Sequence, residues 1–154
     1  MKKVLISACL IGDRVRYDAK DNLNPNIDRL LAHFELVPFC PEVEGGLPTP
    51  RHPSEIKRGR VYSDAGVDVT KHFGLGAQKA LNICKYLQID LAILKEDSPS
   101  CGVSQIHNGL FNKRKIPGQG VTTALLRQHG IEVISEDGIE ALLEKHESKK
   151  DVSN

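Results

Sequence analysis

The stretch LAILKEDSPSCG, residues 91–102, begins as an apolar run and ends in a loop that carries a single cysteine. A short apolar run that stops at turn-forming residues is typical of a strand buried on both faces of a parallel sheet. Three similar runs occur elsewhere in the chain: KKVLISAC at 2–9, ELVPFC at 35–40 and IEVIS at 131–135. We therefore expect a mostly parallel sheet of about four strands.

Helical patterns separate these strands. Asn24 is a candidate N-cap with Pro25 at the first helical position, and later segments place apolar residues three and four positions apart. The expected helices span residues 24–33, about 73–88, 121–129 (closed by Gly130) and 137–146. The alternation of strand and helix predicts a single-domain, doubly wound α/β fold over residues 1–146, followed by a frayed tail at 147–154.

Two long passages interrupt this alternation. Residues 41–69 are rich in proline and glycine and are expected to form an ordered loop with a small hairpin around Ser63–Gly66. Residues 97–120 contain an expected turn at Asn108–Gly109. Loops this long in a compact domain usually serve a site, so we expect them to lie on the ligand side of the sheet.

Composition favours a small ligand over a large polyanion. The chain has 154 residues, 40% of them hydrophobic, which is enough for one core, and its 21 Lys and Arg nearly balance its 20 Asp and Glu. The start, MKKVLISACLIGD, is too short and too interrupted for a signal peptide and is interpreted as a first strand. We expect a cytoplasmic protein with no membrane partner.

The four cysteines divide into one structural residue and three candidates for chemistry. Cys84 shares the apolar stripe of the 73–88 helix, where a thiol behaves as a small hydrophobe. Cys9 and Cys40 end the first two strands, and Cys101 follows the third. Because the carboxyl ends of parallel strands share one edge, these three thiols are expected to be neighbours, and disulfides are not expected in a cytosolic α/β chain.

Several interpretations of the three thiols stay open on residue patterns alone. They could be unrelated buried thiols, although neighbouring glycines would supply free N–H groups around an anionic sulfur centre. Three thiolates together need a cation, which indicates zinc or an iron–sulfur cluster. Zinc could recruit His52 or His107 as a fourth ligand, but both are more simply loop histidines. A four-iron cluster held through three irons, with the fourth open to substrate, needs no histidine.

Five blocks of sequence resemble the thiouracil desulfidase family, the TudS-like proteins. They are SACLIG (7–12), RYD (16–18), CPEVEGGLPTPR (40–51), LKEDSPSCG (94–102) and PGQGVTTALLRQHGIEV (117–133). The resemblance implies a 4Fe–4S cluster held by Cys9, Cys40 and Cys101, with an open iron that takes sulfur from a thiolated pyrimidine in a non-redox reaction. His52 departs from the pattern, because many relatives have proline there.

Candidate catalytic residues flank these cysteines. Glu42, two residues after Cys40, is placed to deprotonate an attacking water, with a solvated loop carboxylate as the alternative interpretation. Ser98 and Ser100 could hydrogen-bond the base or an intermediate, or could serve only the turn. Glu44 and Asp97 are weaker candidates for the same work.

The remaining candidates concern charge and partners. Residues 117–122 lead into a helix start that could bind an anion or a polar base edge, or could be only a tight loop. Arg16, Lys95 and Arg51 could balance the negative charge of a cluster. A small basic patch keeps thiouridine in tRNA open as a less favoured substrate: Lys57, Arg58, Arg60 and residues 113–115. A cluster-binding or zinc-binding sulfur carrier or sensor without turnover is the second class of function.

Overall fold

A parallel four-stranded sheet forms the centre of the computed structural model, which describes the backbone of residues 1–152 and side chains through residue 148. Its strands run in the order β2 (Phe34–Phe39), β1 (Lys2–Ser7), β5 (Leu91–Leu94) and β8 (Glu132–Ser135). All four predicted strands are present, with ends within two residues of those expected. The predicted fold class, a doubly wound α/β fold, is confirmed.

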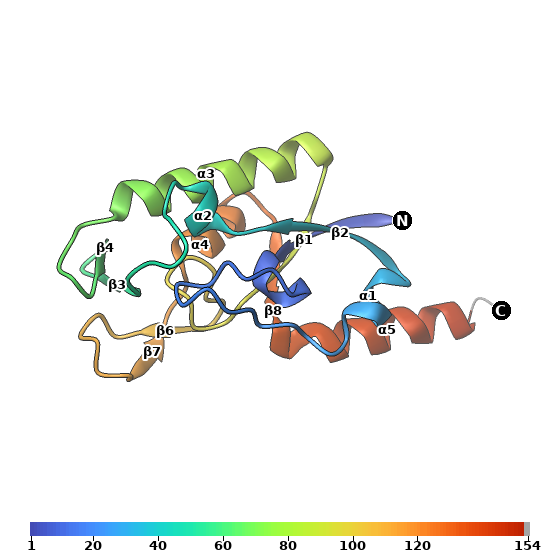
Figure 1. The fold of residues 1–154 in the computed structure, drawn as a ribbon. Helices are drawn as coiled ribbons and strands as arrows, with labels where there is room; N and C mark the ends of the chain where they lie inside the picture. Colours follow the sequence, from blue (N-terminus) through green and yellow to red (C-terminus); the bar gives the residue numbers. More distant parts are fainter. Residues whose placement is uncertain (153–154) are drawn as a thin grey trace.

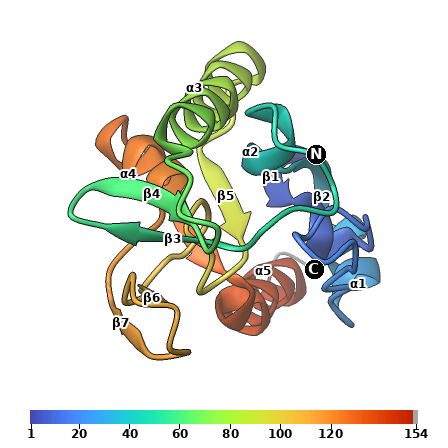
Figure 2. The ribbon, with the colours of Figure 1, turned by 60° about the vertical axis from the view of Figure 1, so that its left-hand side comes forward.

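Helices cover both faces of the sheet (Figures 1 and 2). On one face, Leu5 and Ala92 pack in a core with α3 (Thr70–Leu87) and α4 (Val121–Gln128). On the other face, Val4 and Ile6 pack in a second core with α1 (Ile27–Leu31) and α5 (Ile139–Val152). Alternate residues of each central strand therefore enter different cores, which explains why these strands are apolar throughout.

The first predicted helix is shorter than expected. The Asn24 side chain accepts a hydrogen bond from the backbone N–H of Asn26 (2.9 Å), which makes a local turn, and α1 begins only at Ile27. The prediction of Asn24 as an N-cap is therefore wrong, because an Asn side chain can close a turn as readily as it can cap a helix.

The last helix is longer than expected. A short 3₁₀ turn, η2 (Glu136–Gly138), precedes α5, and α5 then continues to Val152. Glu147, inside the segment predicted to be frayed, pairs with Arg29 at 3.1 Å and so ties the end of α5 to α1. Only residues 153–154 of the predicted tail lie outside the described residues.

Two small hairpins project beyond the carboxyl ends of the strands (Figure 1). β3 (Ser54–Lys57) and β4 (Arg60–Ser63) turn at Arg58–Gly59, which the sequence did not predict. The expected reversal at Ser63–Gly66 is also present, with the Gly66 N–H bonded to the Ser63 carbonyl at 2.9 Å. β6 (Gln105–His107) and β7 (Lys115–Pro117) form the second hairpin, whose long loop starts at Asn108–Gly109.

The strand order creates a crevice at the same end of the molecule. The connection after β1 leads outward to β2, whereas the later strands add on the other side of β1, so the order reverses between β1 and β5. Ligands of open α/β sheets bind outside the carboxyl ends of strands at such a reversal. No helix among the described residues is long and apolar enough to cross a membrane.

Candidate functional site

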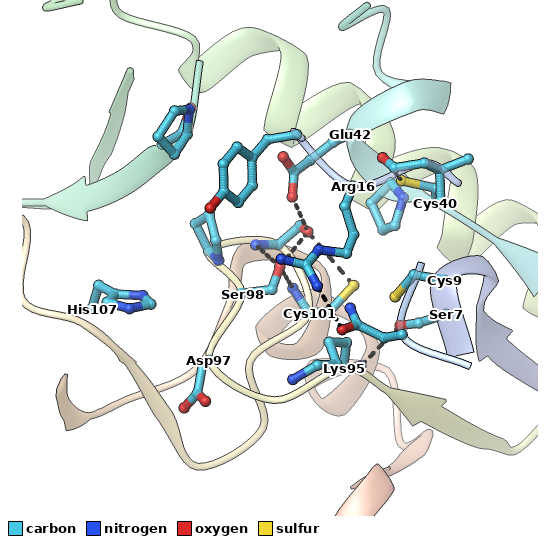
Figure 3. Close-up of a pocket in the computed structure, with 18 of the residues that line it drawn as sticks. Ser7, Cys9, Arg16, Cys40, Glu42, Lys95, Asp97, Ser98, Cys101 and His107 are labelled. Atoms are coloured by element: carbon cyan, nitrogen blue, oxygen red, sulfur yellow. Dashed lines mark hydrogen bonds between the residues drawn. The ribbon is translucent and has the colours of Figure 1, made fainter. Parts of the chain in front are cut away.

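A cavity of about 520 Å³ opens at the reversal point. This volume is typical of small-molecule sites. Its lining includes all six residues that the sequence nominated for ligation and catalysis: Cys9, Cys40, Glu42, Ser98, Ser100 and Cys101. Figure 3 shows the three cysteines on one side of this cavity, with Glu42 and Ser98 beside them. Segments that are 30 to 60 residues apart in sequence thus meet at one edge of the sheet.

Each cysteine is delivered by a different strand end. Cys9 lies in a 3₁₀ turn, η1 (Ala8–Ile11), directly after β1, and Cys40 is the N-cap residue of the short helix α2 (Pro41–Glu44) after β2. Cys101 lies in the loop after β5 and is 4% exposed. Burial raises the pKa of the Cys9 and Cys40 thiols and raises the pKa of Cys101 to about 12. Thiols in such surroundings lose their protons when a bound cation compensates the charge.

The start of α4 holds the Cys101 loop in place. The N–H groups of Gly120, Val121 and Thr122 donate to carbonyls of Gly102, Pro99 and Ser100 at 2.8–2.9 Å. A Cβ atom at Gly120 would lie 2.5 Å from the Ser100 carbonyl oxygen, so only glycine permits this approach. These N–H groups are therefore not free for an anion or a base edge, and the structure favours the tight-loop interpretation of residues 117–122.

A second clamp on this loop comes from Glu96. One carboxylate oxygen of Glu96 accepts hydrogen bonds from the backbone N–H groups of residues 103, 104 and 105 at 2.7–3.0 Å. Its other oxygen accepts from the Ser104 hydroxyl at 2.9 Å. Burial opposes ionisation, but these hydrogen bonds outweigh it and lower the pKa of Glu96 to about 2. The loop that carries Cys101 is thus closed on itself from both ends.

Glu42 is a fixed carboxylate in the cavity wall. Its Oε2 accepts a hydrogen bond from the Ser100 hydroxyl at 2.9 Å, and its Oε1 pairs with Arg51 at 3.2 Å. The Glu42 side chain is 15% exposed and that of Arg51 6%. The alternative interpretation of Glu42 as a solvated loop carboxylate is therefore wrong.

The two serines have different surroundings. The Ser98 hydroxyl oxygen accepts from the backbone N–H groups of Ser100 and Cys101, both at 3.1 Å, which is the geometry of a serine turn. The Ser98 and Ser100 hydroxyls lie 2.9 Å apart, and the Ser100 hydroxyl also lies 3.5 Å from the Cys101 sulfur. Ser98 thus shapes the loop, while Ser100 connects Glu42 to the thiol side of the cavity.

The weaker candidates lie in less suitable places. His52 pairs with Asp64 at 2.7 Å and its side chain is 68% exposed. His107 lines the cavity but stands across it from the cysteines in Figure 3. Glu44 is exposed on α2 outside the cavity, and Asp97 pairs with Lys115 at 2.9 Å. None of these side chains therefore joins the three thiols.

Positive charge surrounds the thiols, as expected, but much of it is paired. Arg16 binds Asp18 at 3.0 Å and the Asn22 side chain at 2.9 Å. Lys95 pairs with Glu136 at 2.7 Å. All of these except Asp18 and Glu136 line the cavity.

Sequence reasoning missed the role of Ser7. Its hydroxyl accepts from the Lys95 N–H at 2.9 Å and so joins the ends of β1 and β5. Its position at a strand end, two residues before Cys9, was the available signal.

The predicted basic patch is partly neutralised. Arg60 pairs with Asp68 at 2.7 Å, and Lys115 with Asp97 at 2.9 Å. Lys113 alone of the patch lines the cavity. These pairs reduce the charge available to a long polyanion, which favours a small substrate over tRNA.

Comparison with known proteins agrees with this geometry. The sequence profile of the 2-thiouracil desulfurase family matches residues 4–138. The chain belongs to the 2-thiouracil desulfurase family. Among members and relatives, the uncharacterized protein YbbK of Bacillus subtilis (strain 168) is 40% identical over 150 residues, which cover 91% of this chain and 99% of YbbK. A solved structure of the 4Fe–4S-dependent thiouracil desulfidase TudS is 47% identical with a TM-score of 0.87, covering 92% of this chain and 95% of that one.

The thiols of this desulfurase-family site suit a cluster better than a single ion. Zinc binds sulfur at about 2.3 Å, so tetrahedral ligand sulfurs lie about 4 Å apart. Among the described residues, no three His, Cys, Asp or Glu side chains gather closely enough to hold one metal ion. A four-iron cluster takes one thiolate per iron, so its ligands stand around it without meeting at a point. Three soft thiols around one cavity fit that donor set.

Proposed function

We propose that the protein is an iron–sulfur-dependent desulfidase that converts a thiolated pyrimidine such as 2-thiouracil into the oxo base and releases sulfide. The observation that carries the proposal is that three thiols from three strand ends share a cavity with the buried Glu42–Ser100 pair. The family match supports a desulfurase, and the TudS relative is described as 4Fe–4S-dependent.

Cys9, Cys40 and Cys101 are the residues that would hold the cluster. With three protein thiolates for four irons, a bound cluster supplies one open iron that acts as a Lewis acid with affinity for sulfide. Burial of the three thiols excludes water from most of their surface. The chain itself must then supply substrate orientation and proton transfer.

The overall reaction is a hydrolysis without electron transfer. The carbon–sulfur bond breaks, a water oxygen forms the new carbon–oxygen bond, and the two water protons leave with the sulfide or return to the ring. Glu42 accepts a proton from the attacking water, because it is the cavity carboxylate nearest the thiols that is held for this task by Arg51 and Ser100.

Ser100 gives Glu42 a route toward the reacting atoms. Its hydroxyl lies 2.9 Å from Glu42 and 2.9 Å from Ser98, so it can donate to the carboxylate while it accepts from Ser98. A proton taken up by Glu42 can return through the same hydroxyl to the cavity. Ser98 contributes by fixing the backbone of Ser100 and Cys101.

The test compares two glutamates of the same short helix. Glu42→Gln keeps the side-chain volume but removes the base, so we expect kcat for sulfide release from 2-thiouracil to fall about 10²- to 10⁴-fold with iron content unchanged. Glu44→Gln, on the exposed side of α2, is the control and retains full activity. Equal rates for Glu42→Gln and wild type would contradict the assignment, and no release by the wild type would favour a carrier or sensor.

A further inference from the structure

Glu55 is a buried carboxylate that the proposed reaction does not use. It lies on β3, is 8% exposed and lines the cavity. Its Oε1 accepts hydrogen bonds from the backbone N–H groups of Gly109 (2.9 Å) and Phe111 (3.2 Å). Both donors belong to the loop between β6 and β7, so Glu55 fastens this loop to the other hairpin.

The fastened loop has an unusual backbone at Phe111. Its φ is +53°, in the left-handed region that bulky side chains rarely adopt. Such a conformation persists only where the surroundings impose it, and it gathers at functional sites. Close seating of the loop on β3 supports this view, because a Cβ atom at Gly109 would lie 2.6 Å from the Ile56 carbonyl oxygen.

The constraint places an aromatic ring at the cavity. Phe111 lines the same cavity as the three cysteines and is 38% exposed. An apolar ring left in contact with solvent at a ligand cavity marks a contact surface for a ligand. The neighbouring Leu110 is 60% exposed and lies outside the cavity lining, so exposure in this loop is not in itself a sign of ligand contact.

We infer that Phe111 is the aromatic face on which the substrate ring stacks, and that Glu55 is the positioning residue that holds it there. The inference rests on the proposed function and deepens it by naming the substrate class as a flat heteroaromatic thiocarbonyl. Every pyrimidine has a π-face, so stacking tolerates different ring substituents. An acyclic thiocarbonyl such as thiourea offers no ring for this contact.

The first test measures binding and turnover in Phe111 variants of the anaerobically purified protein. Base–aromatic stacking predicts that Phe111→Ala raises the Kd for uracil and the KM for 2-thiouracil about 5- to 140-fold, with kcat and iron content little changed. Phe111→Tyr keeps the ring and retains wild-type values. Leu110→Ala is the matched control from the same loop and is neutral. Thiourea turnover, if present, is unaffected by Phe111→Ala.

The second test separates positioning from general stability. Glu55→Gln keeps an acceptor oxygen for the two N–H groups and is expected to behave like wild type, whereas Glu55→Leu is expected to raise KM as Phe111→Ala does. In the double variant, Glu55→Leu adds nothing further once the ring is gone. Unfolding curves of all variants report any loss of fold.

The outcomes distinguish this inference from the proposed function. Unchanged Kd for uracil and unchanged KM in Phe111→Ala overturn the stacking role, while sulfide release by that variant leaves the desulfidase proposal intact. Uracil binding requires no turnover. A wild type that binds uracil through Phe111 but releases no sulfide therefore refutes the proposed reaction and upholds the aromatic contact.

Discussion

Replacing Gly76 with alanine tests how closely the helix that carries Cys40 and Glu42 must pack on α3. Gly76 lies on α3 opposite Pro41, the first residue of α2. A Cβ atom there would overlap the Pro41 carbonyl oxygen and lie 2.7 Å from its carbonyl carbon. The obstacle is backbone, which cannot rotate aside, so α2 must move away from α3 by about an ångström.

The expected magnitude follows from two opposing terms. Overpacking against backbone costs about 3 kcal/mol, the upper part of the usual range, whereas replacing glycine by alanine inside a helix gains about 1 kcal/mol. The net loss is about 2 kcal/mol, which corresponds to a fall in Tm of about 4–8 °C for a chain of this size. Displacement of Glu42 by about 1 Å is expected to lower kcat about 100-fold.

Gly74 gives a matched control two residues earlier on the same helix. No atom lies within 4 Å of a Cβ built at Gly74, so Gly74→Ala gains the helix term without a clash and raises Tm by about 2–4 °C. Thermal unfolding followed by circular dichroism, with sulfide release measured in parallel, compares the two variants. If Gly76→Ala were as stable and as active as Gly74→Ala, the close approach of α2 and α3 would not position the site.

Three further predictions concern the Cys101 loop and the core. Gly120→Ala places a Cβ 2.5 Å from the Ser100 carbonyl oxygen, so iron content after anaerobic reconstitution is expected to fall well below wild type, and full loading would refute the clamp. Because the pKa of Glu96 is lowered from 4.5 to about 2, its carboxylate stabilises the fold above about pH 4.5, and this contribution, up to about 3 kcal/mol, is lost as the pH falls toward 2. Urea unfolding from pH 6 to pH 2.5 should therefore show a shallower decline for Glu96→Gln, and parallel curves would count against the clamp. Cys84→Ala is expected to cost about 1–2 kcal/mol of stability and to leave iron content unchanged, since burial raises the pKa of Cys84 to about 11 in the α3 core; loss of iron in this variant would make Cys84 a ligand.

The parts of the fold that follow from local pattern were predictable from the sequence. Four apolar runs became the four strands, because residues that enter two cores must be apolar at every position. The placement of Cys84 in the core followed from its helical spacing. The β3–β4 hairpin was missed because its turn uses Arg58 at φ +51°, a conformation for which arginine gives no sequence signal.

The site was predictable as far as one topological rule reaches. Carboxyl ends of parallel strands share an edge, which was enough to bring Cys9, Cys40 and Cys101 to one cavity. The contacts of Glu42 with Ser100 and of Glu55 with Phe111 join residues 58 and 56 positions apart. They depend on how long loops fold over the edge, and no periodicity encodes that.

Iron and acid-labile sulfide per chain, measured after anaerobic reconstitution, test the central claim most directly. Wild type and Cys84→Ala are expected to hold about four irons and about four sulfides, whereas Cys9→Ser, Cys40→Ser and Cys101→Ser lose most of both. A wild-type chain that holds one zinc and no sulfide, or a Cys101→Ser variant that keeps its full cluster, would contradict the account.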